Sequence, residues 1–144
     1  MLVISKSAEE TKDIAKKFIK DLIPTSADKA TIVELIGDLG AGKTTFMQGV
    51  GEFFGVKENL VSPTFVIQRN HEIPDGFLWQ KLVHIDAYRI EDEKELHSIA
   101  FDRYASDPAN IIFIEWPGNL GRDSGRSKCI EFVHINENER EIKI

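Results

Sequence analysis

The stretch from residue 30 to residue 50, ATIVELIGDLGAGKTTFMQGV, decides the fold of this chain. Its first part, residues 31–36, is mostly β-branched and apolar, which is typical of a buried strand. A glycine-rich turn follows, and apolar residues then recur at helical spacing from Phe46 to Phe54. The stretch therefore predicts a strand, a tight turn and a helix, the last ending at Gly55.

The turn between Gly37 and Thr44 matches the pattern G-x-x-x-x-G-K-[ST]. Small residues allow backbone N–H groups to converge on phosphates, and the positive end of the following helix faces the same place. In this pattern Lys43 reaches the outer phosphates, while the Thr44 hydroxyl ligates Mg²⁺. We expect the Asp38 side chain to face away, because a carboxylate would repel the phosphates. An ordinary glycine-rich turn is the alternative, and the flanking strand and helix disfavour it.

Length and composition limit the remaining possibilities. A chain of 144 residues with 42% hydrophobic content suits one compact domain, residues 1–144. Its one cysteine, Cys129, excludes an internal disulfide and fits a reducing compartment. The first residues lack the features of a signal peptide, and no apolar run approaches membrane-spanning length. We therefore expect a cytoplasmic protein without a membrane partner.

The net charge bears on nucleic acids. A formal charge of −6 and a pI near 5.2 argue against a dedicated binder of DNA or RNA, which would need a basic face. No DNA partner is expected, and a role involving RNA would run through another protein.

The remaining elements mix strands and helices. Apolar periodicity, capping residues and turn signals predict the following order: a short edge strand at 2–4, an amphipathic helix from Ser7 to just before Pro24, antiparallel strands at 65–73 and 81–87, a helix at 92–104, an apolar strand at 111–114, a loop at 117–128 and a terminal hairpin. The lysines of the first helix are expected to form its solvated face. Together the elements predict an α/β fold of the P-loop NTPase type, with a mixed, largely parallel central sheet and helices on both faces.

Two carboxylates follow apolar strand residues. Glu115 ends the apolar run 111–114, and a strand beside the phosphate-binding strand would bring it to the outer phosphate and its magnesium. That interpretation is favoured over a merely solvated carboxylate because the phosphate loop lies upstream. In the run 82–87, alternation places His84 and Asp86 on one face of a strand. Both strands therefore offer polar groups for chemistry.

Two hydroxyls flank a proline between the helix and the first antiparallel strand. Thr64 or Ser62 could act as a switch residue that closes on Mg²⁺ when the outer phosphate is present. A plain Ser-Pro turn fits the local sequence equally well.

Four motifs in this order resemble the bacterial TsaE family, also called YjeE. They are GDLGAGKTTF at 37–46, SPTF at 62–65, HIDAYR at 84–89 and IEW at 114–116. That family is the small ATPase of the tRNA N6-threonylcarbamoyladenosine pathway. The resemblance therefore implies a P-loop ATPase that uses ATP and Mg²⁺.

The resemblance also implies roles for individual residues. Around the phosphates it places Asp38, Leu39, Gly40, Ala41, Gly42, Lys43, Thr44 and Thr45. Thr44 and Glu115 would serve the metal, Thr64 would be the switch residue, and Asp86 would orient the attacking water or bind the metal through water. His84, Tyr88 and Arg89 would support Asp86 or face a partner. Ala8 and Thr11, at the start of the first helix, would lie by the adenine. Trp116 would stack on a base or a partner residue, with a half-buried core position as the alternative.

The implied activity is weak ATP hydrolysis that rises with partners. In the family those partners are TsaB and TsaD, and TsaD transfers the threonylcarbamoyl group to adenosine in tRNA, so tRNA would be met indirectly. No motif marks an activating arginine; the candidates are Arg89, Arg103, Arg122, Arg126 or a residue of another chain. Two alternatives remain. One is a small-molecule kinase with residues 121–126 as its lid, and the other is a nucleotide-locked assembly factor. A GTPase is disfavoured because the sequence has no N-K-x-D motif.

Overall fold

A computed structural model describes residues 1–24, 26–57, 68–91 and 100–144. The strands are β1 (Leu2–Ser5), β2 (Thr31–Ile36), β3 (Gln68–Glu72), β4 (Lys81–Asp86), β5 (Asn110–Glu115), β6 (Lys128–His134) and β7 (Arg140–Lys143). The helices are α1 (Ala8–Asp21), α2 (Lys43–Phe54) and α4 (Phe101–Ala105), and a 3₁₀ turn, η1, spans Pro117–Leu120. In residues 30–50, a strand, a glycine-rich turn and a helix therefore follow one another, as the sequence predicted.

The strands form one sheet in the order β1-β7-β6-β2-β5-β4-β3. Its middle is parallel, because β2 pairs in parallel with both β5 and β6, and β5 with β4. Its flanks are antiparallel, through the pairs β1–β7, β6–β7 and β3–β4. The predicted mixed sheet, edge strand and terminal hairpin are confirmed. Parallel strands end at the same edge of a sheet, so β2, β4 and β5 present their last residues together.

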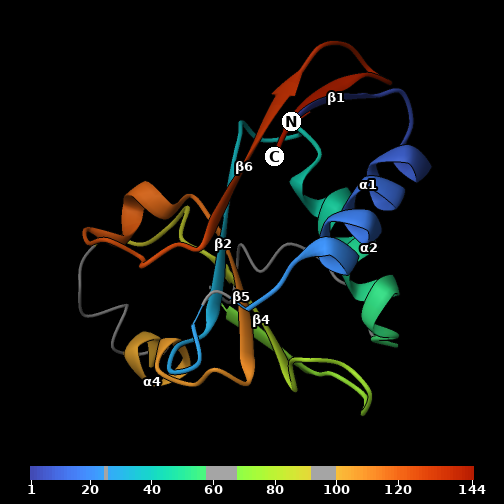
Figure 1. The fold of residues 1–144 in the computed structure, drawn as a ribbon. Helices are drawn as coiled ribbons and strands as arrows, with labels where there is room; N and C mark the ends of the chain where they lie inside the picture. The colour runs from blue at the N-terminus through green and yellow to red at the C-terminus, as the bar shows by residue number, and fades with distance from the viewer. Residues whose placement is uncertain (25, 58–67, 92–99) are drawn as a thin grey trace.

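Helices cover both faces of this sheet (Figure 1), as predicted. α1 and α2 lie together on one face, over a core that includes Phe46, Leu35 and Phe113. α4 lies on the other face, where Val83, Ile85 and Ala87 belong to a second apolar cluster. Val83 and Ile85 alternate along β4 with His84 and Asp86, and Ala87 directly follows the strand, which confirms the predicted two-sided strand.

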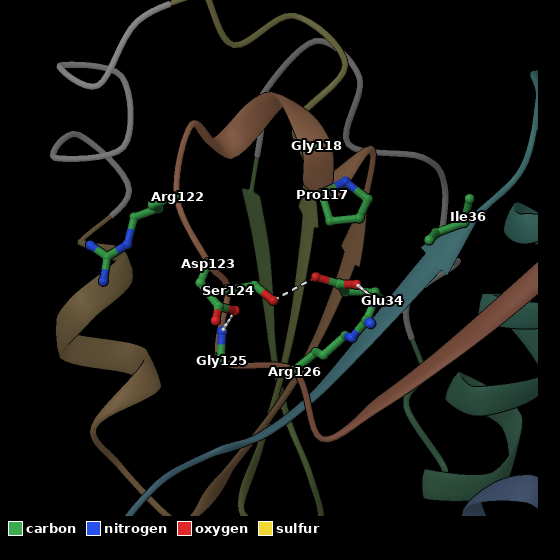
Figure 2. Close-up of a pocket in the computed structure, with 9 residues that line it drawn as sticks. All are labelled: Glu34, Ile36, Pro117, Gly118, Arg122, Asp123, Ser124, Gly125 and Arg126. Carbon is green, nitrogen blue, oxygen red and sulfur yellow. Dashed lines mark hydrogen bonds and ion pairs between the residues drawn. The ribbon is translucent and has the colours of Figure 1, made fainter.

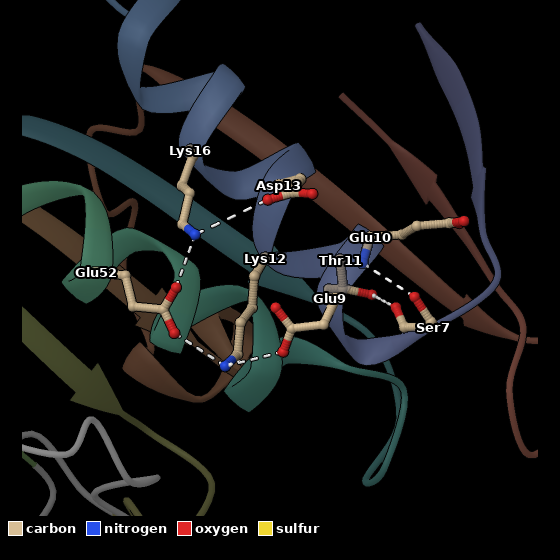
Figure 3. A network of polar contacts seen from close by, with 8 residues as sticks. All are labelled: Ser7, Glu9, Glu10, Thr11, Lys12, Asp13, Lys16 and Glu52. Atoms are coloured by element: carbon tan, nitrogen blue, oxygen red, sulfur yellow. Dashed lines mark hydrogen bonds and ion pairs between the residues drawn. The ribbon is translucent and has the colours of Figure 1, made fainter.

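Helix α1 is tied to the phosphate-loop helix α2. Its N-terminus is capped as the sequence indicated: the backbone N–H of Glu10 donates to the Ser7 hydroxyl. Lys12 and Lys16 both bind the carboxylate of Glu52 on α2, at 2.9 and 2.7 Å (Figure 3). The prediction that the lysines of α1 form only a solvated face is therefore wrong for these two. Their ammonium groups hold the pKa of Glu52 below its usual value.

Two predicted segments need correction. A continuous helix over 92–104 is wrong at Ala100, whose φ of 52° is left-handed and incompatible with a helix interior; residues 92–99 lie outside the described part of the chain. The predicted loop 117–128 contains the η1 turn. Within the described residues, the helices are too short and too polar for any of them to cross a bilayer.

Candidate functional site

A cavity of about 330 Å³ opens at the edge where β4 and β5 end, beside the N-terminus of α2. Loop residues, the first turn of α2, two carboxylates, an indole and a guanidinium surround it. The described residues that line it are Leu39, Gly40, Gly42, Lys43, Thr44, Thr45, Asp86, Glu115, Trp116 and Arg140. Eight of the residues that the sequence singled out from the loop and the two strand ends thus meet in one place, with Trp116 beside them.

The glycine-rich loop aims the start of α2 at this cavity. Gly42 caps the helix with a φ of 109°, which residues with a Cβ rarely adopt. The loop is closed by a hydrogen bond from the Ala41 N–H to the Asp38 carbonyl. Asp38 is exposed and is not among the described residues that line the cavity. The free N–H groups of the first helical turn make the cavity favourable for an anion.

Lys43 is held inside the protein. Only 4% of the residue is exposed, and its Nζ donates to the carbonyls of Gly37 and Asp38. The Nζ also lies 5.0 Å from the centre of the Trp116 ring. Burial lowers the pKa of Lys43, although the nearby carboxylates of Glu115 and Asp86 act in the opposite direction. Burial thus outweighs the carboxylates in its effect on this pKa, and an anion bound in the cavity would favour the charged form of Lys43.

Two carboxylates stand beside this lysine. Asp86 and Glu115 are register partners at the ends of β4 and β5, and each is 3% exposed. Glu115 Oε2 lies 2.8 Å from Nε2 of His84, and Asp86 Oδ1 accepts the N–H of Tyr88 at 2.9 Å. The described residues contain no group of three or more His, Cys, Asp or Glu side chains that could hold a metal by themselves. A hard cation here would therefore take part of its oxygen shell from phosphate and water, as Mg²⁺ does.

Comparisons with known proteins identify the family of this chain. The family model described as threonylcarbamoyl adenosine biosynthesis protein TsaE matches residues 5–143. The chain belongs to the TsaE family. A Bacillus subtilis relative, named tRNA threonylcarbamoyladenosine biosynthesis protein TsaE, is 36% identical over 93% of this chain and 78% of its own length. One of the same name from Rickettsia typhi is 37% identical over 76% of this chain and 69% of its own.

A solved structure supports the same conclusion. The crystal structure of Bacillus subtilis YdiB has a TM-score of 0.70 and 28% identity, and the match covers 99% of this chain and 82% of that one. The fold is thus the α/β fold of P-loop NTPases, as predicted. The resemblance of the four motifs to the TsaE family is confirmed.

Trp116 has the half-buried position that was the alternative for it in this TsaE chain, and its predicted stacking on a base or a partner residue stays a prediction. Its indole packs on the second apolar cluster and, tilted, against the Tyr88 ring at 4.9 Å. It also lines the cavity, with a left-handed backbone φ of 56°. The half-buried aromatic is therefore part of the cavity wall.

The sequence analysis missed Arg140, the guanidinium in this cavity. Arg140 begins β7 and extends across the phosphate loop, with its Cδ 2.7 Å from where a Cβ on Gly42 would stand. Its Nε is buried and has no hydrogen-bond partner among the described residues. No local signal marks it, because its place depends on the pairing of β7 beside β6 and β1.

The arginines that the sequence analysis named are not among the described residues lining this cavity. Arg122 binds Asp102 and Arg126 binds Glu34, both at 3.0 Å. Figure 2 shows Arg126 and Ser124 directed at Glu34 around a second cavity, of about 610 Å³. Glu34 lies on the opposite side of β2 from Val33 and Leu35, whose side chains face α1 and α2.

The other predicted residues lie around or outside the described site. Thr11 is buried, and its hydroxyl bonds that of Ser5 at 2.7 Å; Ser5 is the register partner of Arg140. The start of α1, with Ala8, therefore adjoins the Arg140 side of the site, although Ala8 and Thr11 are not among the described residues lining the cavity. Thr64 and Ser62 lie outside the described residues.

Proposed function

We propose that this chain binds ATP with Mg²⁺ and hydrolyses it as a component of the machinery that makes N6-threonylcarbamoyladenosine in tRNA. The observation that carries the proposal is the meeting of buried Lys43 with Asp86 and Glu115 at the N-terminus of α2. A cation and a helix N-terminus suit phosphates, and carboxylates beside them suit a metal. Membership of the TsaE family supplies the pathway.

Phosphate binding would use groups that are already in place. The loop from Leu39 to Thr45 contributes backbone N–H groups, and Lys43 exchanges the carbonyls of Gly37 and Asp38 for phosphate oxygens. Arg140 adds a second cation on the Gly42 side. Ala8 and Thr11 are proposed to lie near the adenine, because the start of α1 adjoins Arg140 through Ser5.

The metal would be held by Thr44 and Glu115. When bound, Mg²⁺ would neutralise charge on the phosphate oxygens. The Thr44 hydroxyl and one Glu115 oxygen are hard donors that line the cavity, which fits the few protein ligands that Mg²⁺ usually takes. Asp86, on the neighbouring strand, is proposed to orient the attacking water or to bind the metal through water. Thr64 keeps its proposed role as the switch residue.

Partners are expected to complete the activity. We assign TsaB and TsaD homologues as the partners and tRNA as an indirect one, with residues 1–144 as one domain working in the cytoplasm. An arginine at the transferred phosphate raises rates roughly 10³- to 10⁵-fold in related NTPases. Arg122 and Arg126 are paired with Asp102 and Glu34, which favours the ATPase over a kinase that would use these arginines in a lid.

The test is ATP hydrolysis by the purified chain, alone and with cognate TsaB and TsaD, with GTP in parallel. We expect slow, Mg²⁺-dependent, ATP-selective turnover that rises sharply with the partners. Lys43→Ala and Glu115→Ala should abolish that rise, whereas Arg122→Ala, outside the cavity, should retain it. Hydrolysis indifferent to TsaB and TsaD, or tRNA modification that survives Lys43→Ala, would contradict the proposal.

A further inference from the structure

The buried imidazole of His84 makes its polar contact with Glu115. The residue is 1% exposed, and Nε2 lies 2.8 Å from Oε2 of the carboxylate. The resemblance to TsaE had suggested that His84 supports Asp86 or faces a partner. A side chain this deeply buried does not face a partner, and its 2.8 Å contact is with Glu115, the other carboxylate.

The parallel register explains why these two residues meet. His84 stands opposite Phe113, and Asp86 stands opposite Glu115. In a parallel pair, opposite residues share a face, and so do residues two apart on one strand. His84 and Glu115 therefore lie on the same face of the sheet, with Glu115 two residues further along. The imidazole therefore reaches forward to Glu115, at the edge of the sheet where the cavity opens.

The hydrogen bond engages one particular oxygen of the carboxylate. An ionised carboxylate only accepts, so Nε2 carries the proton in this contact and Oε2 is engaged. Oε1 is then the oxygen that Glu115 can offer to a ligand in the cavity. Lys43 attracts the same carboxylate, so without a second restraint Glu115 would be drawn toward that cation.

The state of the other ring nitrogen, Nδ1, indicates that His84 serves to position Glu115 and not merely to fill the core. His84 Nδ1 is buried and has no hydrogen-bond partner among the described residues. An imidazole kept only to fill space would carry this unpaired nitrogen at a cost that an apolar side chain avoids. What the ring supplies and an apolar residue does not is the N–H directed at Glu115.

We propose that His84 is a positioning residue that fixes Glu115 as a ligand of the divalent cation. The inference rests on the proposed function for the presence of that cation. Partners that hold a ligating carboxylate or imidazole typically contribute 10- to 100-fold to metal affinity. His84 thus acts on the metal through Glu115 without touching it.

The experiment measures the affinity of Mn²⁺, as a paramagnetic substitute for Mg²⁺, for the ADP-bound chain by electron paramagnetic resonance. His84→Met removes the donor at similar volume, whereas His84→Gln keeps an N–H near the place of Nε2. We expect about 10- to 100-fold weaker Mn²⁺ binding for His84→Met and near-normal binding for His84→Gln. Affinity for ADP in EDTA should be equal in all three proteins. If His84→Met does not fold, His84→Asn, whose amide is too short to reach Glu115, replaces it.

A second background separates positioning from packing. In Glu115→Ala, the further change His84→Met should cost no additional Mn²⁺ affinity, because the group through which it acts is gone. Normal Mn²⁺ affinity in His84→Met, or an equal loss in the Glu115→Ala background, would overturn the inference alone. Failure of the unaltered chain to bind Mn²⁺ with ADP would instead overturn the proposed function.

Discussion

The Cδ atom of Arg140 lies 2.7 Å from the position that a Cβ on Gly42 would occupy, and its Nη1 lies 3.0 Å from it. β7, the last strand in the chain, thus packs a cation directly on the phosphate loop. Glycine at residue 42 leaves room for the Arg140 side chain, and it also permits the backbone φ of 109°.

Gly42→Ala should therefore weaken nucleotide binding more than Gly40→Ala does. Both glycines have positive φ, but a Cβ on Gly40 would meet nothing within 4 Å. Backbone strain is common to the two changes, and displacement of Arg140 is specific to the first. We expect at least about a 10-fold larger loss of ADP affinity for Gly42→Ala, measured by titration calorimetry. Equal losses would show that the contact with Arg140 is without consequence.

Replacing the cation itself gives a separate prediction. Arg140→Ala should weaken ADP binding by about 1.5 to 3 kcal/mol, the range for hydrogen bonds to charged groups. Arg122→Ala is the matched control, because its guanidinium binds Asp102 and does not line the cavity. Higher salt should narrow the difference between wild type and Arg140→Ala. Unchanged ADP affinity in Arg140→Ala would remove the residue from the site.

The lowered pKa of Lys43 predicts a pH dependence of binding. Burial makes the free protein release this proton at a lower pH than the ordinary value of 10.5. A bound phosphate favours the charged form and raises the pKa again. Nucleotide binding should therefore take up a proton at alkaline pH, and affinity should fall as pH rises through the pKa of the free protein.

Calorimetry in buffers of different ionisation enthalpy measures that proton uptake. Lys43→Arg is the control, because a guanidinium stays charged throughout the range. Any binding that Lys43→Arg retains should lack the alkaline fall. A fall of the same size in both proteins would assign it to another group.

Ser124 should contribute to stability through a buried carboxylate. Its hydroxyl donates to Glu34 Oε1 at 2.6 Å, and both residues are more than nine-tenths buried. Ser124→Ala removes that donor and should lower the free energy of unfolding by about 1 to 3 kcal/mol. The control is Ser106→Ala, whose hydroxyl makes an exposed 2.6 Å bond to a carbonyl and should matter less. Urea unfolding distinguishes them, and equal midpoints would refute the prediction.

Sequence reasoning located the parts of the site that local rules determine. The spacing from Gly37 to Thr44 fixes a loop, and the end of a buried strand fixes where Glu115 and Asp86 emerge. Contacts that depend on the register between strands could not be predicted from local sequence. The contact of His84 with Glu115 needs the pairing of β4 with β5, and the place of Arg140 needs the pairing of β7 with β6. The helix predicted over 92–104 failed at Ala100, where helical composition is overridden by a left-handed backbone.

The order of strands also constrains how the chain acquires its shape. β2, which carries the phosphate loop, pairs with β5 at Ile111 and with β6 at Lys128, both far along the chain. Loop-closure entropy must be overcome before such pairings stabilise the sheet, so we expect β2 to pair late in folding. Both neighbours of β2 are present only after synthesis has passed β6, at Lys128–His134. We therefore expect nucleotide, bound as proposed, to stabilise the folded protein and to have little influence on the nascent chain.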